Sequence, residues 1–560
     1  MQKILRVMII IAMLITAYLL ILAWRDDYAD APAVEATPKS ATSVGADIPS
    51  TTGTAGDIPA QTLPIDNSIA TTAPTKDNGL ISVTTNRYDI KIDPEGGDIV
   101  YAALKQYDAT LDSDEPFVLL ENNSNRVYIA QSGLIGQDGI DTAEGRASYS
   151  YTADNYVMEE GQQTLSVPLT YQKDGVTITK TYTFTNDKYP IDVSYQIQNR
   201  TAQPWQGQLF AQLKRDDSKD PGMSDKGALS MATYLGGAWG TPEDPYNKLK
   251  FGKFGNNEIN VSSDKGWVGI VQHYFVSAWT PENFTGQFFS RETGSDYFIG
   301  FNSQPINIAA NKQLTLDATL YAGPKVQSEL KDVAVGLNQT VDYGLLWPIS
   351  KILFAILDGI HKVLGNWGWS IIVLTILVKI SLMWFSNKSY YSMAKMRSLA
   401  PKLAALKEEH GDDRMKMSQE MMAIYKEEKV NPMAGCLPIL MQMPIFLALY
   451  WVLVESVELR HAPWILWIQD LSAMDPWFIL PLLMGVSMFI QQQLNPQPAD
   501  PMQAKVMKFL PIIFTAFMLF FPAGLVLYWT VNNLFSMTQQ YIVNKKVEEE
   551  QKRRTVKVLG

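Results

Sequence analysis

The feature that most constrains the fold of this chain is a run of 36 consecutive uncharged residues, Phe509–Asn544. One membrane-spanning helix needs about 20 apolar residues and two need about 40. Pro522-Ala523-Gly524 lies where a tight turn would divide the run into two helices. Each helix would be short for a span, so we expect tilting or local thinning of the bilayer. The run therefore predicts two spans joined by a tight turn.

Four other segments have the length and composition of membrane spans, which gives six in total. The segments are Val7–Trp24, Trp367–Ser386, Pro432–Val454 and Pro476–Gln493. The second of them contains a single lysine, and the last is short for a span. We therefore expect a multi-pass α-helical membrane protein.

The distribution of charge predicts how these spans are oriented. The chain has 47 basic and 57 acidic residues, but residues 25–345 alone have 24 and 41, a net charge of −17. The other residues together have a net charge of +7. Lys and Arg are concentrated in the segment after the second span and in the C-terminal tail. Because basic loops stay in the cytoplasm, both termini are expected there, with the acidic region outside.

The first 79 residues divide into an expected anchor and an expected linker. Lys3 and Arg6 precede the first apolar run and acidic residues follow it, which favours an uncleaved transmembrane anchor over residues 1–25. Cleavage is the alternative, since Ala29 and Ala31 fit a signal-peptidase site. Residues 26–79 are rich in Ala, Thr, Pro and Asp and poor in aromatic residues, a composition typical of a flexible linker.

Residues 80–335 have the sequence pattern of an all-β domain. Val176–Thr185 and Ile191–Gln198 alternate with period two and are rich in β-branched and aromatic residues. Lys173-Asp174-Gly175, just before the first of them, is typical of a hairpin turn. Similar runs continue to about residue 320, so we expect a large antiparallel sandwich.

Three further segments accompany the predicted core spans, which lie within residues 366–543. Residues 345–365 have one apolar and one charged helical face, which predicts an amphipathic helix in the membrane interface; packing on the sandwich is the alternative. Residues 387–431 have apolar residues at helical spacing on both sides of a Gly-Asp-Asp break, which predicts a cytoplasmic helical hairpin. Residues 544–560 form a basic cytoplasmic tail.

Lys379 is the one charged residue inside the predicted second span. A charge at the bilayer centre costs roughly 3 kcal/mol or more, so such a residue is a functional candidate; snorkelling to the interface is the simpler alternative. No acidic residue is expected at the same depth. The spans also carry many polar side chains, and together with a cation they favour a hydrated cavity over helix–helix hydrogen bonds alone. These side chains are Thr375, Gln442, Asn532, Asn533, Ser536, Gln539 and Gln540.

Several segments closely resemble the YidC/Oxa/Alb family of membrane protein insertases. In the membrane half they are Tyr390–Arg397 (YYSMAKMR), Ser418–Pro432 (SQEMMAIYKEEKVNP), Leu440–Leu453 (LMQMPIFLALYWVL), Ser456–Trp464 (SVELRHAPW) and Phe521–Leu534 (FPAGLVLYWTVNNL). In the acidic half, Gly96–Ile99 (GGDI) and Gln272–Trp279 (QHYFVSAW) resemble segments of the Gram-negative members. The resemblance covers nearly the whole chain.

The resemblance implies that five of the six spans form an insertase core with a hydrophilic groove, open to the cytoplasm and the bilayer but closed to the periplasm. It also implies that the periplasmic domain is a β-supersandwich similar to sugar-mutarotase folds. The family's groove normally holds an arginine, and Lys379 is the matching residue here; unlike arginine, a desolvated lysine can lose its proton. Other positions that match groove or substrate-contact residues are Thr375, Gln442, Met443, Phe446, Tyr528, Trp529, Asn533 and Ser536.

The predicted function is that of an insertase and chaperone in the bacterial inner membrane, acting alone or with the Sec translocon. We expect no catalytic activity, no cofactor and no metal: the sequence has no P-loop glycine pattern, and its one cysteine, Cys436, excludes a cysteine metal cluster. Expected partners are nascent inner-membrane proteins, the Sec translocon and the lipid bilayer. The hairpin and tail are expected to contact the ribosome and the signal recognition particle or its receptor. Sequence-specific nucleic-acid binding is not expected.

Two other functions are alternatives to that of an insertase. A small-solute transporter or channel should have inverted repeats or paired intramembrane charges, and the sequence has neither. A membrane-tethered sugar-modifying enzyme would use exposed tryptophans such as Trp205 and an acid–base pair in the sandwich. The only histidine of the sandwich is His273, which we expect to be an ordinary core or surface residue.

Overall fold

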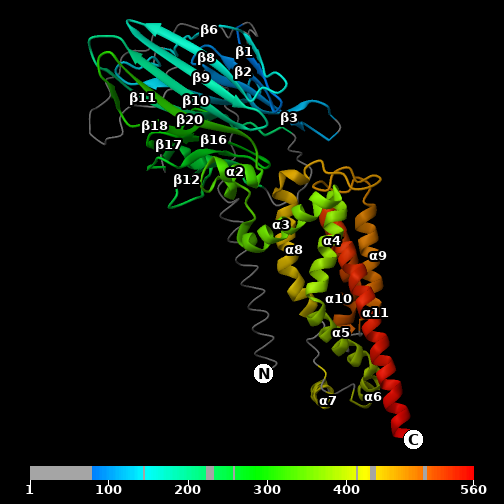
Figure 1. The fold of residues 1–560 in the computed structure, drawn as a ribbon. Helices are drawn as coiled ribbons and strands as arrows, with labels where there is room; N and C mark the ends of the chain where they lie inside the picture. The colour runs from blue at the N-terminus through cyan, green and yellow to red at the C-terminus, as the bar shows by residue number, and fades with distance from the viewer. Residues whose placement is uncertain are drawn as a thin grey trace.

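The structure is a computed structural model that describes residues 79–111, 113–142, 145–221, 233–256, 259–410, 414–428, 430, 437–495 and 501–559. The predicted anchor (1–25) and all but the last residue of the predicted linker (26–79) lie outside the described residues. Figure 1 shows two parts, a β domain that comes first in the chain and a bundle of helices that follows it.

The β domain consists of an 11-stranded and a nine-stranded sheet that share one hydrophobic core. All the strand pairs are antiparallel except β1 with β7. The larger sheet has the order β14-β17-β18-β11-β5-β4-β3-β2-β1-β7, with β19 on β11, and the smaller has the order β13-β12-β15-β16-β20-β10-β9-β8-β6. The strands are β1 (Ile81–Thr84), β2 (Tyr88–Asp93), β3 (Asp98–Asp108), β4 (Pro116–Asn122), β5 (Val127–Ile135), β6 (Ser150–Tyr151), β7 (Asn155–Val157), β8 (Thr164–Lys173), β9 (Val176–Thr185), β10 (Pro190–Asn199), β11 (Trp205–Arg215), β12 (Gly236–Gly240), β13 (Asn247–Leu249), β14 (Val261–Ser263), β15 (Trp267–Val271), β16 (Phe275–Pro281), β17 (Gly286–Thr293), β18 (Asp296–Ser303), β19 (Ile306–Ile308) and β20 (Lys312–Pro324).

The predicted strands and hairpin are confirmed at β8, β9 and β10. Along β9 and β10, buried residues alternate with more exposed ones, as period-two patterning requires. Between β8 and β9, Asp174 and Gly175 have φ of 49° and 82°, the left-handed pair that a two-residue hairpin needs. Trp205, which we expected to be exposed, lies at the start of β11 and is only 3% exposed. It therefore does not form a sugar-binding surface.

The helical part begins directly after β20. Its helices are α2 (Gln327–Val333), α3 (Trp347–Leu364), α4 (Trp367–Ser381), α5 (Met383–Ser398), α6 (Ala400–His410), α7 (Arg414–Glu427), α8 (Leu437–Glu455), α9 (Ile479–Gln493), α10 (Pro501–Met518) and α11 (Ala523–Leu559), with short 3-10 turns η3 (Leu337–Thr340), η4 (Gly344–Leu346) and η6 (Val457–Leu459). The predicted hairpin contains α6 and α7; the Gly-Asp-Asp break between them lies outside the described residues.

The chain turns sharply between α3 and α4 because of its local sequence. Gly365 has φ of 68°, and its N–H donates to the carbonyl of His361, which ends α3. Asn366 then caps α4, since its Oδ1 accepts from the N–H of Trp369 at 3.1 Å. As a result α3 lies across the top of the bundle in Figure 1, while α4, α8 and α11 run along it.

Two expectations about the spans need correction. The predicted second span, Trp367–Ser386, is not one helix: α4 and α5 meet at Leu382 with a bend of 68°. The run Phe509–Asn544 does divide at Pro522, where the N–H groups of Ala523 and Gly524 donate to carbonyls of the α8–α9 loop. However, the helices extend beyond the run: α10 begins before it, at Pro501, and has 18 residues, and α11 continues past it to Leu559 for 37 residues.

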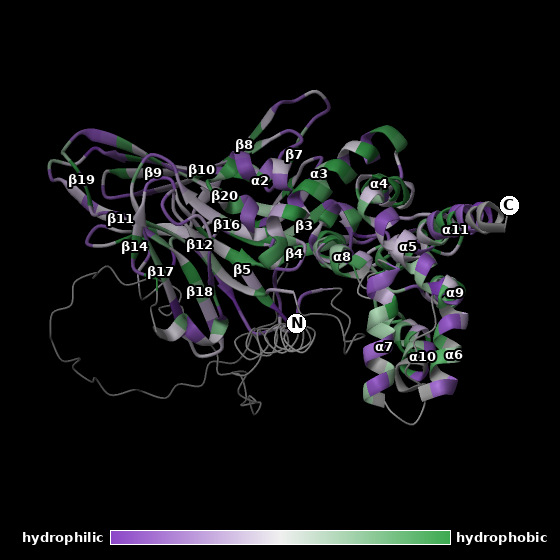
Figure 2. Cartoon of the chain, turned by 90° about the horizontal axis from the view of Figure 1, so that it is seen from below, coloured by the Kyte–Doolittle hydropathy of each residue, from purple (hydrophilic) through white to green (hydrophobic). Residues whose placement is uncertain are grey.

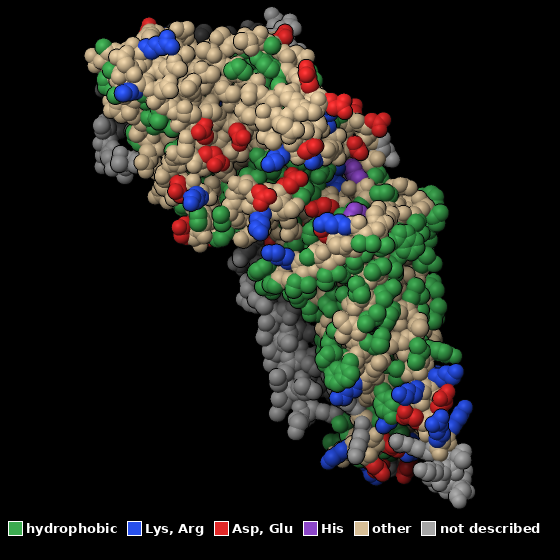
Figure 3. All heavy atoms as spheres, viewed as in Figure 1, with side chains coloured by type: hydrophobic (Ala, Val, Ile, Leu, Met, Phe, Trp, Pro, Cys, Tyr) green, Lys and Arg blue, Asp and Glu red, His purple; other side chains and the backbone are tan. Residues whose placement is uncertain are grey.

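Hydrophobic side chains cover the sides of the bundle. In Figure 3 they form a band below the β domain, and charged side chains reappear at the lower end. Figure 2 likewise shows α3 and α4 as largely hydrophobic, whereas hydrophilic residues interrupt α7. By length and composition, one described helix, Gly344–Leu364, is able to cross a membrane, and the bent pair α4–α5 would be a second if it counts as one span.

Candidate functional site

The predicted site residues come from three helices of the bundle. Thr375 and Lys379 lie on α4; Gln442, Met443 and Phe446 on α8; and Tyr528, Trp529, Asn533 and Ser536 on α11. Most are buried, but Met443 is 39% exposed. The residues of α8 and α11 therefore form a seam between helices that opens at Met443.

Four of these residues join α8 to α11. Gln442 Nε2 donates a hydrogen bond to the hydroxyl of Tyr528. One helical turn further along, the ring of Phe446 lies edge-on to Trp529, with centroids 4.7 Å apart and planes at 84°. Trp529 also packs against Phe514 of α10, with centroids 4.8 Å apart. An amide–phenol pair followed by an aromatic stack thus gives the seam a polar part and an apolar part.

Lys379 is the charged residue of the site. It is only 6% exposed, and no hydrogen bond or ion pair reaches its ammonium group from any described residue. Its predicted neighbour Thr375 is fully buried and donates instead to the carbonyl of Ile371 at 2.7 Å, within α4.

The polar side chains of α11, which we call the polar stripe, are Asn532, Asn533, Ser536, Gln539 and Gln540. We expected them to line a hydrated cavity, but most of them form hydrogen bonds to neighbouring helices. Asn533 Nδ2 donates to Ser487 of α9 at 3.0 Å, and Gln540 Nε2 donates to Asn495 at 3.0 Å. Gln539 Nε2 donates to Asn387 of α5 at 2.8 Å, whereas the hydroxyl of Ser536 donates to the carbonyl of Asn532 within α11 at 2.7 Å. Most of these groups therefore tie α11 to its neighbours, as interhelical hydrogen bonds do in membranes. The side-chain oxygens of Asn532, Gln539 and Gln540 are buried without a described partner.

Sequence reasoning missed several residues of the site. Ser487, Asn387 and Asn495 bind the stripe, and Phe514 completes the aromatic stack. The only signal for them was the presence of polar residues within or beside apolar runs. A cavity of about 600 Å³ also lies between α4, α5 and α11. Its lining includes Asn387, Lys546 and Gln539, one of the polar side chains expected at a hydrated cavity, but none of the positions matched to the family's groove.

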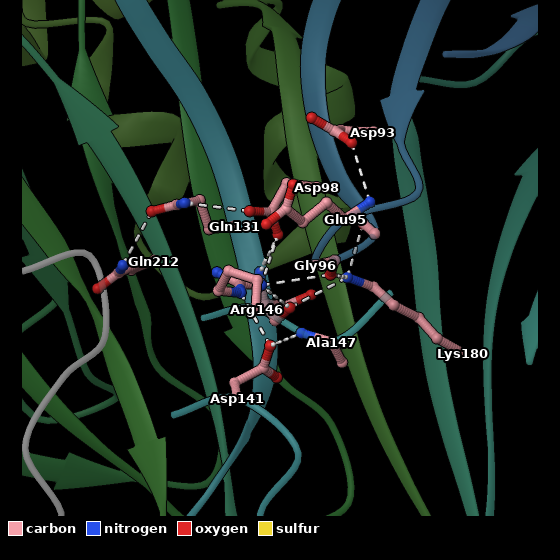
Figure 4. A network of polar contacts seen from close by, with 12 residues as sticks. Asp93, Glu95, Gly96, Asp98, Gln131, Asp141, Arg146, Ala147, Lys180 and Gln212 are labelled. Atoms are coloured by element: carbon pink, nitrogen blue, oxygen red, sulfur yellow. Dashed lines mark hydrogen bonds and ion pairs between the residues drawn. The ribbon is translucent and has the colours of Figure 1, made fainter. Parts of the chain in front are cut away.

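The β domain contains a buried polar cluster that the sequence did not reveal, shown in Figure 4. Arg146 lies 2.9 Å from both Asp98 and Asp141, and Lys180 donates to the carbonyls of Gly96, Gly97 and Ser132. Burial lowers the pKa of Lys180 to about 7, although Asp98 acts in the opposite direction. Burial also raises the pKa of Asp98, which Arg146 opposes.

The cluster is closed to substrates. The three charged groups Asp98, Asp141 and Lys180 are 5% exposed or less, and their hydrogen bonds are made to Arg146, to the side chain of Gln131 or to the backbone. Such a network holds strands together rather than exchanging protons with a ligand. The acid–base pair that a sugar-modifying enzyme would need at a surface is not formed by these residues.

Comparisons with known proteins agree with the resemblance in the sequence. The family described as "YidC periplasmic domain" matches residues 80–356, and the family described as "60Kd inner membrane protein" matches residues 359–551. The chain is 50% identical over 560 residues to "Membrane protein insertase YidC" of Stutzerimonas stutzeri, covering 97% of this chain and 98% of that protein. It is 49% identical to the protein of the same name from Pseudomonas syringae pv. syringae, over 98% and 99% of the two chains.

Solved structures give weaker matches. One is described as an active YidC insertase crystal structure with the first transmembrane domain resolved; it has 18% identity and a TM-score of 0.36, and covers 83% of this chain and 92% of that chain. Another is a galactose mutarotase-like protein from Lactobacillus casei with 11% identity and a TM-score of 0.29, covering 44% of this chain and all of that chain.

Proposed function

The chain belongs to the YidC membrane protein insertase family, and we propose that it inserts nascent inner-membrane proteins through a groove at Lys379. The observation that carries this proposal is a nearly buried lysine with no acidic partner among the described residues. Because burying an unpaired cation costs roughly 3 kcal/mol, its position is explained best by a partner that arrives and leaves. Acidic and polar segments of a passing polypeptide have the required chemistry.

In the proposed mechanism no nucleotide is hydrolysed. A polar segment of the substrate enters beside Lys379, whose charge lowers the cost of removing that segment from water. The adjoining apolar segment slides along Met443, which is the exposed edge of the seam, and along the Phe446–Trp529 stack into the bilayer. The membrane potential assists outward movement of acidic residues by about 2.3 kcal/mol per charge per 100 mV.

Gln442, Tyr528, Thr375, Asn533 and Ser536 have supporting roles in this proposal. Gln442 and Tyr528 are the polar contacts nearest the aromatic stack, and they exchange their mutual hydrogen bond for bonds to the substrate. Asn533 holds α11 in register with α9, and Ser536, whose hydroxyl donates to the carbonyl of Asn532, stabilises α11 itself. Thr375 keeps α4 packed where Lys379 projects.

We also propose the membrane arrangement predicted from sequence: six spans with both termini in the cytoplasm, five of them forming the core, and the β domain as a supersandwich in the periplasm. The hydrophobic band below the β domain and the crosswise position of α3 support it. The basic residues near the lower end of the bundle are also consistent with a cytoplasmic side. In this arrangement the proteins it inserts are those of the bacterial inner membrane.

The proposed partners are nascent inner-membrane proteins, the Sec translocon and lipids, together with the ribosome and the signal recognition particle or its receptor at α6, α7 and the end of α11. We propose that the chain has no catalytic activity. The transporter alternative has no support, because no paired charges are found inside the described part of the bundle, where Lys379 stands without an acidic partner.

The test compares Lys379→Ala, Lys379→Glu and Lys379→Arg in cells depleted of their own insertase, with insertion of an acidic-tailed substrate as the readout. Lys379→Arg should retain insertion, Lys379→Ala should reduce it and Lys379→Glu should abolish it. Lys362→Glu is the matched control, since Lys362 is a 73% exposed lysine paired with Asp358 on α3. Wild-type insertion of acidic-tailed substrates by Lys379→Glu would disprove the electrostatic role.

A further inference from the structure

The cavity between α4, α5 and α11 is long and narrow. Its lining on α11 runs from Val531 to Lys546, which are 15 residues apart and roughly 22 Å apart along a helix. The opposite wall comes from α4 and α5, on both sides of the 68° bend at Leu382. Since α11 packs against both of these helices (Figure 1), the bend leaves a space along one continuous neighbour.

The cavity opens at an apolar part of the bundle surface. Leu534 and Ile542, which line it, are 50% and 61% exposed. The other apolar side chains of the lining are Ile376, Met383, Val531, Phe535 and Val543. Protein side chains pack closely and leave few voids larger than a water molecule. In the proposed membrane arrangement this surface faces the bilayer, so the space is expected to be filled by hydrocarbon.

The width of the cavity excludes a helix as its occupant. A volume of about 600 Å³ spread over roughly 22 Å gives a mean cross-section of about 27 Å². A helix with its side chains is about 10–12 Å across, which corresponds to a cross-section of roughly 80–110 Å². A transmembrane helix of a substrate or of a second copy of this chain is therefore too wide, whereas an extended acyl chain fits.

Polar side chains of the lining lie toward the end of the cavity that we propose to be cytoplasmic. Gln539 Nε2 donates to Oδ1 of Asn387 at 2.8 Å, and Nδ2 of Asn387 has no partner among the described residues. Lys546 follows Gln539 by seven residues, about two helical turns. Because side chains on a helix lean toward its N-terminus, Lys546 leans back toward Gln539. An amide donor and a cation thus follow the apolar part of the cavity.

The ammonium group of Lys546 is available to a ligand. Glu550, one helical turn further along α11, accepts a hydrogen bond from the hydroxyl of Tyr391 at 2.8 Å. No hydrogen bond or ion pair joins Lys546 to any residue that the structure describes. A second cation lies near the same end, since Lys395 Nζ is 4.9 Å from the ring centroid of Tyr391. Basic pockets between spans on the cytoplasmic side are typical sites for anionic lipid headgroups.

We propose that this cavity binds one anionic phospholipid of the cytoplasmic leaflet. One acyl chain lies along α11 beside Val531 and Leu534, Nδ2 of Asn387 donates to an ester carbonyl, and Lys546 binds the phosphate. The order of these groups in the cavity is the order of chain, ester and phosphate in a phospholipid. The leaflet assignment rests on the membrane arrangement given under the proposed function, but the site uses none of the groove residues.

The experiment maps lipid contacts of the full-length chain in phosphatidylcholine vesicles. Each preparation contains the same small amount of a phospholipid with a photoreactive acyl chain, either phosphatidylglycerol or phosphatidylcholine, and mass spectrometry measures the crosslinking yield. In residues 531–546 the phosphatidylglycerol probe should give about fivefold more product, the factor that one basic residue contributes near an anionic surface. In residues 482–486 of α9, where Leu482 and Val486 are exposed, the two probes should give equal yields.

Three variants separate the headgroup contact from the acyl-chain contact. Lys546→Glu should abolish the preference for phosphatidylglycerol in residues 531–546. Lys545→Glu is the matched control, because this exposed neighbour has the same charge but does not line the cavity, and it should keep the preference. Val543→Trp fills the apolar part of the cavity and should lower the yield of both probes in residues 531–546 without changing it in residues 482–486.

Equal yields from the two probes in residues 531–546 of the wild type would overturn the proposal. Equal loss of the preference in Lys546→Glu and Lys545→Glu, or unchanged yields in Val543→Trp, would also overturn it. A photoreactive residue at Leu534 should crosslink to lipid, and crosslinking to a nascent chain or to a second copy instead would contradict the proposed occupant.

The lipid site and the groove can fail separately, because the lipid yields are measured without a substrate. If Lys379→Glu inserts normally while the preference for phosphatidylglycerol persists, the lipid site stands and the electrostatic role of the groove falls. If the preference is absent while Lys379→Glu abolishes insertion, only the lipid site is lost.

Discussion

Acidification from pH 7 to pH 5 is expected to destabilise the junction between the sandwich and α8 through His273. Burial lowers the pKa of His273 to about 3, and the positive charges of Lys325 and Arg460 lower it further. The hydrogen bond to Val454 acts in the opposite direction, and Glu455 is already paired with Lys325. His273 is therefore neutral in the folded protein at both pH values.

The sign and size of the effect follow from the protons bound in the two states. At pH 5 an unfolded histidine with a pKa near 6.5 is protonated, whereas folded His273 is not, so the unfolded state binds more protons and stability falls as pH falls. A pKa of about 6.5 in the unfolded state and about 3 in the folded state corresponds to a loss of about 2 kcal/mol of unfolding free energy between pH 7 and pH 5. This is an upper value, because the ring is partly exposed.

The assay is urea unfolding of the full-length protein in detergent at pH 7, 6 and 5, followed by tryptophan fluorescence. Wild type should lose more unfolding free energy on acidification than His273→Gln, which keeps a donor for Val454 but cannot be protonated. His361→Gln, which changes a histidine stacked on Trp367 away from the junction, should lose less of the pH dependence than His273→Gln, because burial also lowers the pKa of His361 but Asp358 opposes it. Equal pH dependence for wild type and His273→Gln would refute this reasoning.

Three other substitutions test separate parts of the structure. Arg146→Met leaves two carboxylates buried in the sandwich and should cost about 3–5 kcal/mol, seen as a lower urea midpoint for the β domain; an unchanged midpoint would contradict the role of the cluster. Asn533→Leu removes the hydrogen bond to Ser487 and should cost about 0.6–2 kcal/mol in detergent, whereas Thr538→Leu on the exposed face should cost less. Phe446→Ala removes the edge-to-face contact with Trp529, worth about 0.5–1.5 kcal/mol, and should slow insertion; insertion at the wild-type rate would show that the stack does not guide substrates.

The parts of the fold that local sequence determines were predictable. The hairpin between β8 and β9 follows from Asp174-Gly175, and the division of the last apolar run follows from Pro522. The bend at Leu382 was not predictable, because no glycine or proline occurs between Ile376 and Ser386 to signal a break. The length of α11 was underestimated because charge was taken as the end of the span, although a helix can continue through charged residues into water.

The site was predictable only where chemistry alone identifies a residue. Lys379 stands out because a charge in an apolar run is costly. The partners of Asn533 and Gln539 depend on which helices become neighbours, which the sequence pattern does not encode. Lys325 and Glu455 are 130 residues apart and look like ordinary surface charges, so their pairing emerges only when the two parts of the chain meet.

The most direct test of the groove is site-specific photo-crosslinking to a ribosome-bound nascent chain with a single transmembrane segment. A photoreactive residue is placed at Lys379, at Met443 or at Leu482, which is 57% exposed on α9 and outside the proposed groove. The nascent segment should crosslink to the probes at Lys379 and Met443 and not to the probe at Leu482. Crosslinking at Leu482 as strong as at Met443, or none at Lys379 and Met443, would contradict the proposed groove.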